Sequence, residues 1–197
     1  MKTNRLARVE RKTRETEVEI DLNLDGKGTS RIDTSYPFLD HMLSLFAYHG
    51  FFDLTVVAKG DIKVDYHHLA EDVGICLGKA VRKALGEKKG IRRYGSFFVP
   101  MDEVLAQVAV DISGRPVVVF KFPSSEEQHG SELELMKEFF RGFASHAGVT
   151  LHVNLCYGSG AHHLMEAAFK AFALSLDEAT GLDERREEIP STKEKLG

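Results

Sequence analysis

Two copies of a His-His-x-x-Glu motif are the residues of this sequence whose types and spacing could most readily do chemistry. One copy runs from His67 to Glu71 and the other from His162 to Glu166. Residues three or four positions apart share one face of a helix, so each glutamate is expected to lie near both of its histidines. Imidazole nitrogens and carboxylate oxygens together suit a divalent transition metal better than Ca²⁺ or Mg²⁺. The motifs therefore predict a metal centre.

The duplication of the motif bears on the number of ions. Neighbouring residues of a helix point about 100° apart, so His67 and His68 are expected to bind different ions, and the same holds for the second pair. A single pair is more often an ordinary helix feature, but two pairs with Glu at the same offset favour metal binding. Two further histidines are candidate ligands because of their neighbours, namely His41 after Asp40 and His152 in a strand.

The elements that must hold these motifs follow the same order in both halves of the chain. In the first half, apolar periodicity predicts a strand at 18–24, followed by a hairpin turn at 25–28 and a return strand through Ile32. A helix at 38–49, a strand at 54–57 and a second helix at 67–85 follow. The second half repeats the series, with a strand at 104–110, a turn at 113–116 and a return strand at 117–120. A helix at 133–146, a strand at 149–155 and a helix at 162–176 complete it. His129 is expected in a polar loop between the strand at 117–120 and the helix at 133–146.

This order indicates an internal repeat. Phe46 and His49 recur as Phe143 and His146, and each half closes with its His-His-x-x-Glu helix. We expect an α+β fold of two halves related by pseudo-twofold symmetry, each a β-sheet with two helices on one face. The first repeat is expected at 1–90, the second at 91–185 and a C-terminal tail at 186–197.

Composition narrows the classes of function. The chain has 197 residues, 43% of them hydrophobic, and a formal net charge of -4, which fits a compact globular protein and not a nucleic-acid-binding one. No apolar run approaches the roughly 18 residues of a membrane span, and the first residues lack the apolar core of a signal peptide. We therefore expect a cytoplasmic protein with no membrane partner, in which Cys76 and Cys156 are reduced core residues.

Several further motifs lie along nearly the whole chain. They are, in chain order, Arg14-Glu15-Thr16, Leu24-Asp25-Gly26-x-Gly28, Pro37-Phe38-Leu39-Asp40-His41-Met42, Gly90-Ile91-x-Arg93-x-Gly95, Ser113-Gly114-Arg115-Pro116, Thr150-Leu151-His152 and Ser191-Thr192-Lys193. Together with the two His-His-x-x-Glu motifs, they resemble the imidazoleglycerol-phosphate dehydratase family of histidine biosynthesis.

The resemblance implies a fold, a cofactor and an assembly. The fold would be two halves similar to ribosomal-protein-S5-domain-2, and each active site would hold two Mn²⁺ ions, with other divalent transition metals as alternatives. The chain would form a homo-oligomer, a 24-subunit octahedral shell built from trimers with sites at subunit interfaces. The reaction would be dehydration of imidazoleglycerol phosphate to imidazole-acetol phosphate, with the substrate ring held as a metal-bound imidazolate that passes through a diazafulvene.

The resemblance also carries residue roles over to this chain. The metal ligands would be His41, His67, His68, Glu71, His162, His163 and Glu166. The substrate phosphate would be held by Arg93, Arg115, Lys170, Ser191 and Lys193, with the tail as a lid. Glu15 would be the catalytic base, and its repeat partner Glu103 has no assigned role.

Two positions depart from the family pattern. The family commonly has histidine where this chain has Glu138, which is also the repeat partner of His41. Glu138 is therefore either a replacement ligand or a surface charge beside Lys137. The family commonly has glutamine where this chain has Leu45, a change that removes a polar contact.

Two other functions use the same metal ligands. A two-metal hydrolase would activate water and cleave phosphate esters. A purely structural centre would clamp subunits together without turnover, but the basic set of Arg93, Arg115 and Lys170 disfavours it.

Overall fold

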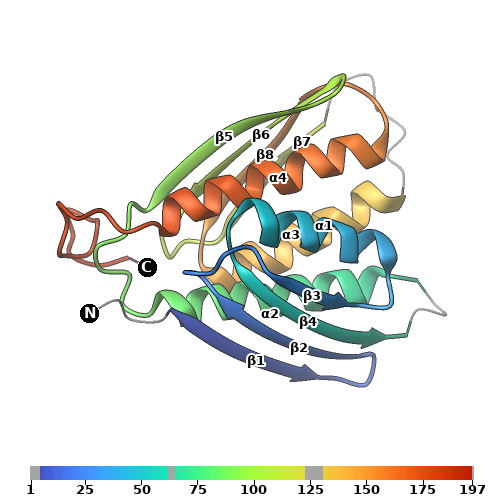
Figure 1. The fold of residues 1–197 in the computed structure, drawn as a ribbon, viewed down its shortest axis with the longest axis horizontal. Coiled ribbons are helices and arrows are strands. Elements are labelled where there is room, and N and C mark those ends of the chain that lie inside the picture. Colours follow the sequence, from blue (N-terminus) through green and yellow to red (C-terminus); the bar gives the residue numbers. More distant parts are fainter. Residues whose placement is uncertain (1–4, 62–64, 123–130, 197) are drawn as a thin grey trace.

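The computed structural model describes residues 5–61, 65–122 and 131–196, so His129 lies outside the described residues. Within these ranges two four-stranded sheets enclose four helices, in the layer order sheet, helices, helices, sheet (Figure 1). Each half contributes one sheet and two helices that cover its inner face. This arrangement confirms the α+β fold of two similar halves expected from the repeat.

The first half runs in the order strand, strand, strand, helix, strand, helix. Its elements are β1 (Leu6–Lys12), β2 (Thr16–Asn23), β3 (Ser30–Asp33), α1 (Pro37–His49), β4 (Asp53–Gly60) and α2 (His67–Leu85). The strand order in the sheet is β1-β2-β4-β3. Alternate residues of β2 such as Val18 and Ile20 are buried against the helices, as the period of two requires.

The second half repeats this order with strands of nearly the same length. Its elements are β5 (Tyr94–Met101), β6 (Val104–Asp111), β7 (Val117–Lys121), α3 (Ser131–Ala147), β8 (Thr150–Tyr157) and α4 (Ala161–Thr180). The sheet order is β5-β6-β8-β7. The segment after α4 continues to the C-terminus without a further helix or strand in its described residues, and it protrudes from one end of the molecule (Figure 1).

The expected hairpin through residues 25–28 is wrong, and so is its counterpart through 113–116. β3 pairs in parallel with β4, which lies between β2 and β3, and β7 pairs in parallel with β8 in the same way. The connection after β2 is instead held to the start of β4, because the backbone N–H groups of Lys27 and Thr29 donate to Asp53 Oδ1. The true hairpins join β1 to β2 and β5 to β6.

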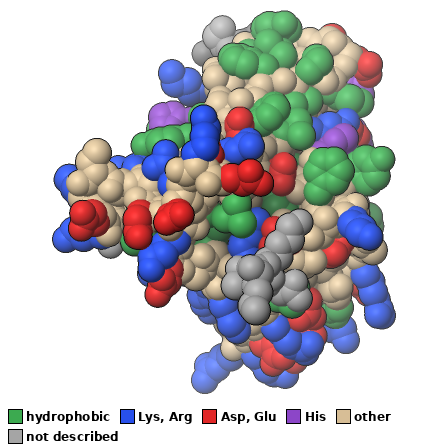
Figure 2. Space-filling model, turned by 60° about the vertical axis from the view of Figure 1, so that its left-hand side comes forward, with side chains coloured by type: hydrophobic (Ala, Val, Ile, Leu, Met, Phe, Trp, Pro, Cys, Tyr) green, Lys and Arg blue, Asp and Glu red, His purple; other side chains and the backbone are tan. Residues whose placement is uncertain are grey.

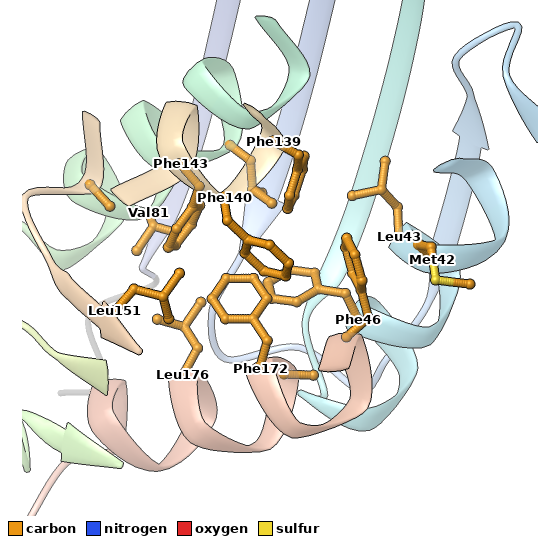
Figure 3. Close-up of a cluster of buried hydrophobic side chains, with 14 of the residues drawn as sticks. Met42, Leu43, Phe46, Val81, Phe139, Phe140, Phe143, Leu151, Phe172 and Leu176 are labelled. Carbon is orange, nitrogen blue, oxygen red and sulfur yellow. The ribbon is translucent and has the colours of Figure 1, made fainter. Parts of the chain in front are cut away.

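One hydrophobic core joins the two halves (Figure 3). Phe172 of α4 lies at its centre, with ring centroids 5.1 Å from Phe46, 5.3 Å from Phe140 and 4.8 Å from Phe143. Phe46 belongs to the first half and the other rings to the second, so neither half buries its helices alone.

The closest contact between the halves is the crossing of α2 and α3. Gly142 of α3 lies where a Cβ atom would stand 2.7 Å from the carbonyl oxygen of Glu71, and a Cβ atom on Gly74 of α2 would stand 2.2 Å from the Phe139 carbonyl oxygen. Only glycine lets the two backbones approach this closely. The crossing fixes the second half against the helix that carries His67 and Glu71.

Candidate functional site

Three predicted metal ligands converge from two helices. His41 on α1 and His162 on α4 each place Nε2 2.9 Å from Glu166 Oε1. The three donor atoms lie within 4.8 Å of one another, and Glu166 is buried while both histidines are exposed. Two imidazole nitrogens and one carboxylate are a donor set that fits a divalent transition metal.

Glu166 is held ionised by its neighbours. Lys170, one helical turn further on, donates from Nζ to Glu166 Oε2 at 2.7 Å. Burial by itself raises the pKa of Glu166, but the hydrogen bonds from Lys170 and His41 outweigh it and lower the pKa to about 2. The carboxylate is therefore available as an anionic ligand across the physiological pH range.

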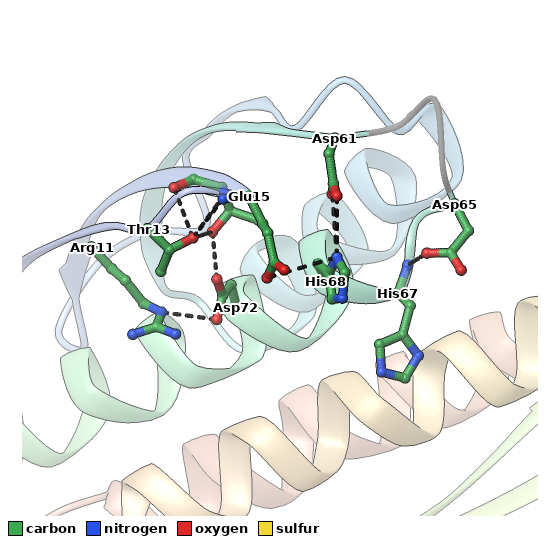
Figure 4. A network of polar contacts seen from close by, with 9 residues as sticks. Arg11, Thr13, Glu15, Asp61, Asp65, His67, His68 and Asp72 are labelled. Atoms are coloured by element: carbon green, nitrogen blue, oxygen red, sulfur yellow. Dashed lines mark hydrogen bonds and ion pairs between the residues drawn. The ribbon is translucent and has the colours of Figure 1, made fainter.

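The adjacent histidines of each pair diverge. The rings of His67 and His68 are 5.8 Å apart at an interplanar angle of 87°, and those of His162 and His163 are 6.1 Å apart at 73°. His68 turns toward Asp61 and Glu15, whereas His67 points away from them (Figure 4). The two rings of one pair thus face different surroundings.

A carboxylate lies beside the second histidine of each pair. His68 Nδ1 is 3.3 Å from both carboxylate oxygens of Asp61 and 3.8 Å from Glu15 Oε2. His163 Nδ1 is 3.2 Å from Glu103 Oε2. The pKa of Glu103 is lowered, first by a hydrogen bond from its own backbone N–H and next by His163. Repeat alignment singled out Glu103, but Asp61 has glycine as its repeat counterpart and gave no such signal.

The repeat counterparts of the convergent group, Glu138, His67 and Glu71, do not come together in the part of the chain that the structure describes. Glu138 occupies the place on α3 that His41 occupies on α1, and it forms an ion pair with Arg141. Among the described residues neither the Glu71 carboxylate nor the His67 ring makes a hydrogen bond, and the backbone N–H of His67 donates to Asp65 Oδ1. One chain therefore assembles the His41, His162 and Glu166 group, whereas the equivalent residues Glu138, His67 and Glu71 stay apart.

The predicted phosphate ligands separate into two places. Arg93, Arg115, Ser191 and Lys193 line one pocket between the protruding tail and the second sheet. Lys170 lies instead at Glu166. The same pocket is lined by Arg186 and Lys195, which no motif singled out and which only the path of the tail brings there. This end of the molecule carries many Lys and Arg side chains interspersed with acidic ones (Figure 2).

Arg93 ties the tail to the body. Its Nε donates to Asp111 Oδ1 at 2.7 Å, and its Nη1 donates to the Pro190 carbonyl oxygen at 2.8 Å. Arg93 thereby links the Pro190 backbone, in a segment without helix or strand, to Asp111 at the end of β6. Hydrogen bonding to Asp111 raises the pKa of Arg93, which keeps it cationic.

The basic pocket and the convergent histidines lie at opposite ends of α4. Arg93 N–H donates to the Ala179 carbonyl oxygen near the end of the helix, whereas His162 is in its first turn. At about 1.5 Å of rise per residue, His162 and Ala179 are about 25 Å apart. Within one chain, a small phosphorylated molecule cannot touch both places.

Two other residues singled out by the sequence lie elsewhere. His152 is on the outer face of the second sheet, with Gln107, Lys121 and Asn154, because its neighbours Leu151 and Val153 fill the inner face. Leu45 is half-buried and packs against the core. Both cysteines are free thiols, as expected. Cys76 is fully buried and is a core residue, whereas Cys156 is only half-buried.

The sequence is similar to known proteins of one family along most of its length. The profile of the family described as imidazoleglycerol-phosphate dehydratase matches residues 34–176. The imidazoleglycerol-phosphate dehydratase of Citrifermentans bemidjiense is 56% identical over 98% of this chain and 99% of its own length, and that of Acetivibrio thermocellus is 58% identical over 94% and 95%.

Solved structures give the same result. The imidazoleglycerol-phosphate dehydratase of Staphylococcus aureus superposes with a TM-score of 0.79 at 38% identity, covering 90% of this chain and 99% of that one. The enzyme of Pyrococcus furiosus gives a TM-score of 0.80 at 35% identity, covering 95% and 100%. Within the described residues, no helix has the length and apolar character that crossing a membrane requires. By profile, by sequence and by structure, the chain belongs to the imidazoleglycerol-phosphate dehydratase family.

Proposed function

We propose that this protein is a metal-dependent hydro-lyase that removes water from imidazoleglycerol phosphate to give imidazole-acetol phosphate, a step of histidine biosynthesis. Family membership supports the reaction. The observation that carries the metal dependence is the convergence of His41, His162 and Glu166 on one point from two helices. Two imidazole nitrogens and one carboxylate are the donor types that divalent transition metals take in proteins.

The metal would be held by the histidines and glutamates of both motifs. His41, His162 and Glu166 fit one ion as they stand. His67, His68, Glu71 and His163 are the remaining motif donors for a second ion, with Glu138 in the place equivalent to His41. Two Mn²⁺ ions are the proposed cofactor, and when bound they supply positive charge that stabilises negative charge on the substrate imidazole.

Glu15 is the proposed catalytic base. It lies in the turn before β2, with Oε2 3.8 Å from His68 Nδ1, so it stands at the edge of the metal ligands. Its side chain is 55% exposed, which leaves it free to reach a substrate. It accepts the proton from the side-chain carbon next to the one that loses hydroxide, and the enol formed becomes the ketone by moving one further proton.

The phosphate group is proposed to bind in the tail pocket. Arg115 and Lys193 offer cations there, Ser191 offers a hydroxyl, and Arg93 holds the tail in place through Pro190. Guanidinium groups form paired hydrogen bonds to phosphate oxygens. Lys170 has its Nζ at Glu166 and would act at the metal end of the substrate.

The separation of about 25 Å along α4 supports a site shared between subunits. A tail pocket of one chain placed against the histidines of another would complete one site. A homo-oligomer is therefore proposed, and the 24-subunit shell of trimers that the family resemblance implies is one assembly that meets this requirement.

Turnover of Mn²⁺-loaded protein tests the reaction. Incubation with imidazoleglycerol phosphate should give the ketone product, and removal of metal by a chelator should abolish it. Release of inorganic phosphate instead of ketone would indicate the two-metal hydrolase. A fully metal-loaded assembly that yields neither product would contradict the proposal.

Complementation tests the shared site. His162→Ala removes a ligand at the metal end, and Arg115→Ala weakens the phosphate end. Each variant alone should therefore have little activity at substrate concentrations below the wild-type KM. Co-assembled in equal amounts, they should recover activity in about a quarter of the sites, because random mixing brings two intact ends together there. If the mixed assembly forms but recovers no activity, the metal end and the phosphate end of each site belong to one chain.

A further inference from the structure

The duplication places a glutamate in front of each second histidine. Glu15 precedes the first residue of β2, and Glu103 precedes the first residue of β6, and the two strands have the same length. His68 and His163 are likewise the second histidines of their motifs. The two carboxylates are therefore equivalent by position.

They are not equivalent in their contacts. Glu103 lies at hydrogen-bonding distance from His163 Nδ1, with its two oxygens at 3.3 and 3.2 Å. Glu15 stands back at 3.8 Å from His68 Nδ1, and Asp61 takes the closer place with both oxygens at 3.3 Å. In the first half the partner of the histidine has thus changed (Figure 4).

The register of the sheets explains the difference. Thr16, the first residue of β2, pairs with Gly60, the last residue of β4. In the second half the register shifts between Leu105 and Ala106, and Leu105 pairs with Tyr157, the last residue of β8. Glu103 is consequently carried one residue further past the end of its partner strand than Glu15 is.

The loops that follow these strands add to the shift. Gly60 and His68 are eight positions apart, whereas Tyr157 and His163 are six apart. The repeat counterpart of Asp61 is Gly158, with φ 108°, where a Cβ atom would stand 2.6 Å from Val104 Cα and 2.8 Å from the Glu103 carbonyl oxygen. The second half therefore has no room for an aspartate at that position, and Glu103 fills its place.

We infer that Glu103 and Asp61 are positioning residues that fix the two second histidines of the metal centre, while Glu15, which lies too far from His68 for a hydrogen bond, serves the reaction. A carboxylate can only accept, so Nδ1 of each histidine carries the hydrogen and Nε2 keeps its lone pair for a metal ion. The inference rests on the metal centre of the proposed function. Outer carboxylates of this kind raise the affinity of a histidine for metal about 10–100-fold.

The competing interpretation is that Glu103 is itself a ligand. Asp102, Glu103 and His163 have donor atoms within 4.8 Å of one another and could hold an ion between them. The two interpretations differ at Asp102, which a ligand group needs and a positioning role does not. Asp102 has φ 47°, a conformation that asparagine also tolerates, so Asp102→Asn removes the charge without straining the turn.

The experiment is a competition titration of Mn²⁺ against a chromophoric chelator, carried out on the intact assembly. Glu103→Ala and Asp61→Ala are each expected to weaken Mn²⁺ binding about 10–100-fold. Glu103→Gln and Asp61→Asn should recover part of the affinity, because the amide oxygen still accepts from Nδ1. The controls Asp102→Asn and Glu15→Ala should bind Mn²⁺ like the wild type.

The outcomes separate this inference from the proposed function. Unchanged affinity in Glu103→Ala and Asp61→Ala would overturn the inference and leave the enzyme assignment intact. An equal loss in Asp102→Asn would overturn it in favour of a metal bound at Asp102, Glu103 and His163. Wild-type protein that binds no Mn²⁺ would overturn both the inference and the proposed function. If the variants lose Mn²⁺ affinity as expected but the wild type has no dehydratase activity, only the proposed function is overturned. Thermal unfolding of each metal-free variant verifies folding, since Glu103 is 49% exposed.

Discussion

His41 Nε2 and Glu166 Oε1 are 2.9 Å apart although 125 positions separate the two residues in the chain. The first residue lies on the α1 helix of one half and the second on the α4 helix of the other. The convergent donor group is therefore a product of the packing between the halves, and it depends on the core that holds α1 against α4.

Removing one donor of this group should remove one metal. His162→Ala is expected to lower the Mn²⁺ content by one ion per chain, because the remaining pair of donors cannot complete the set. Metal analysis of the purified assembly measures this. The matched control is His146→Ala on α3, a histidine of neither motif whose Nδ1 lies 2.9 Å from the Gly142 carbonyl oxygen, which should keep full metal content. Full occupancy in His162→Ala would remove His162 from the ligands.

Acid should destabilise the metal-free protein through Glu166. Its pKa is about 2 in the fold against an ordinary 4.5, so its ionised form stabilises the fold above pH 4.5 and that stabilisation is lost as pH falls toward 2. The loss is expected to be on the order of 1–2 kcal/mol after solvent screening. Glu166→Gln should flatten this part of the profile, measured as the free energy of unfolding against pH with a chelator present. Parallel profiles for the two proteins would contradict it.

Truncating the central ring of the core should weaken both halves at once. Phe172 is fully buried against Phe46, Phe140 and Phe143, so Phe172→Ala is expected to cost about 3–5 kcal/mol. Chemical denaturation measures this as the free energy of unfolding. The control is Tyr48→Ala on α1, where the ring is 68% exposed and the cost should be below about 1 kcal/mol. Equal effects would mean that the core does not join the halves.

A methyl group at the α2 and α3 crossing should push the helices apart. Gly142→Ala places a Cβ atom 2.7 Å from the Glu71 carbonyl oxygen, and the expected cost is about 1–3 kcal/mol. Because Glu71 lies on the displaced helix, Mn²⁺ affinity should fall with stability. Gly86→Ala is the control for lost stability alone. No atom lies within 4 Å of its Cβ position, but φ 53° and ψ -124° strain any side chain there, so stability should fall while Mn²⁺ affinity is kept. Full metal affinity in Gly142→Ala would show that the crossing does not set the ligand geometry.

Loss of a tail-pocket cation should weaken substrate binding. Arg115→Ala is expected to raise KM about 10–100-fold through the loss of charge-assisted hydrogen bonds to phosphate, with Mn²⁺ content unchanged. Steady-state kinetics with imidazoleglycerol phosphate measures this. Arg185→Ala is the control, because that side chain is 89% exposed and paired with Asp183. A KM that is unchanged in Arg115→Ala would place the phosphate elsewhere.

The sequence by itself determined the elements and the repeat. Apolar periodicity located α2 and α4 because their buried faces recur at helical spacing, and the matched motifs revealed two halves of one design. It missed the edge strands β1 and β5, in which alternate residues are exposed and the apolar signal is weak. The types of donor atom in the His-His-x-x-Glu motifs were also sufficient to predict a metal.

Only the tertiary structure decided which strands pair and which donors meet. The parallel pairing of β3 with β4 depends on a crossover that local turn residues do not encode. His41, His162 and Glu166 meet because two helices from different halves pack side by side, whereas Glu138, the equivalent of His41, pairs with Arg141 instead. The one-residue register shift at Leu105 likewise distinguishes Glu103 from Glu15, and pairing register is a property of the whole sheet.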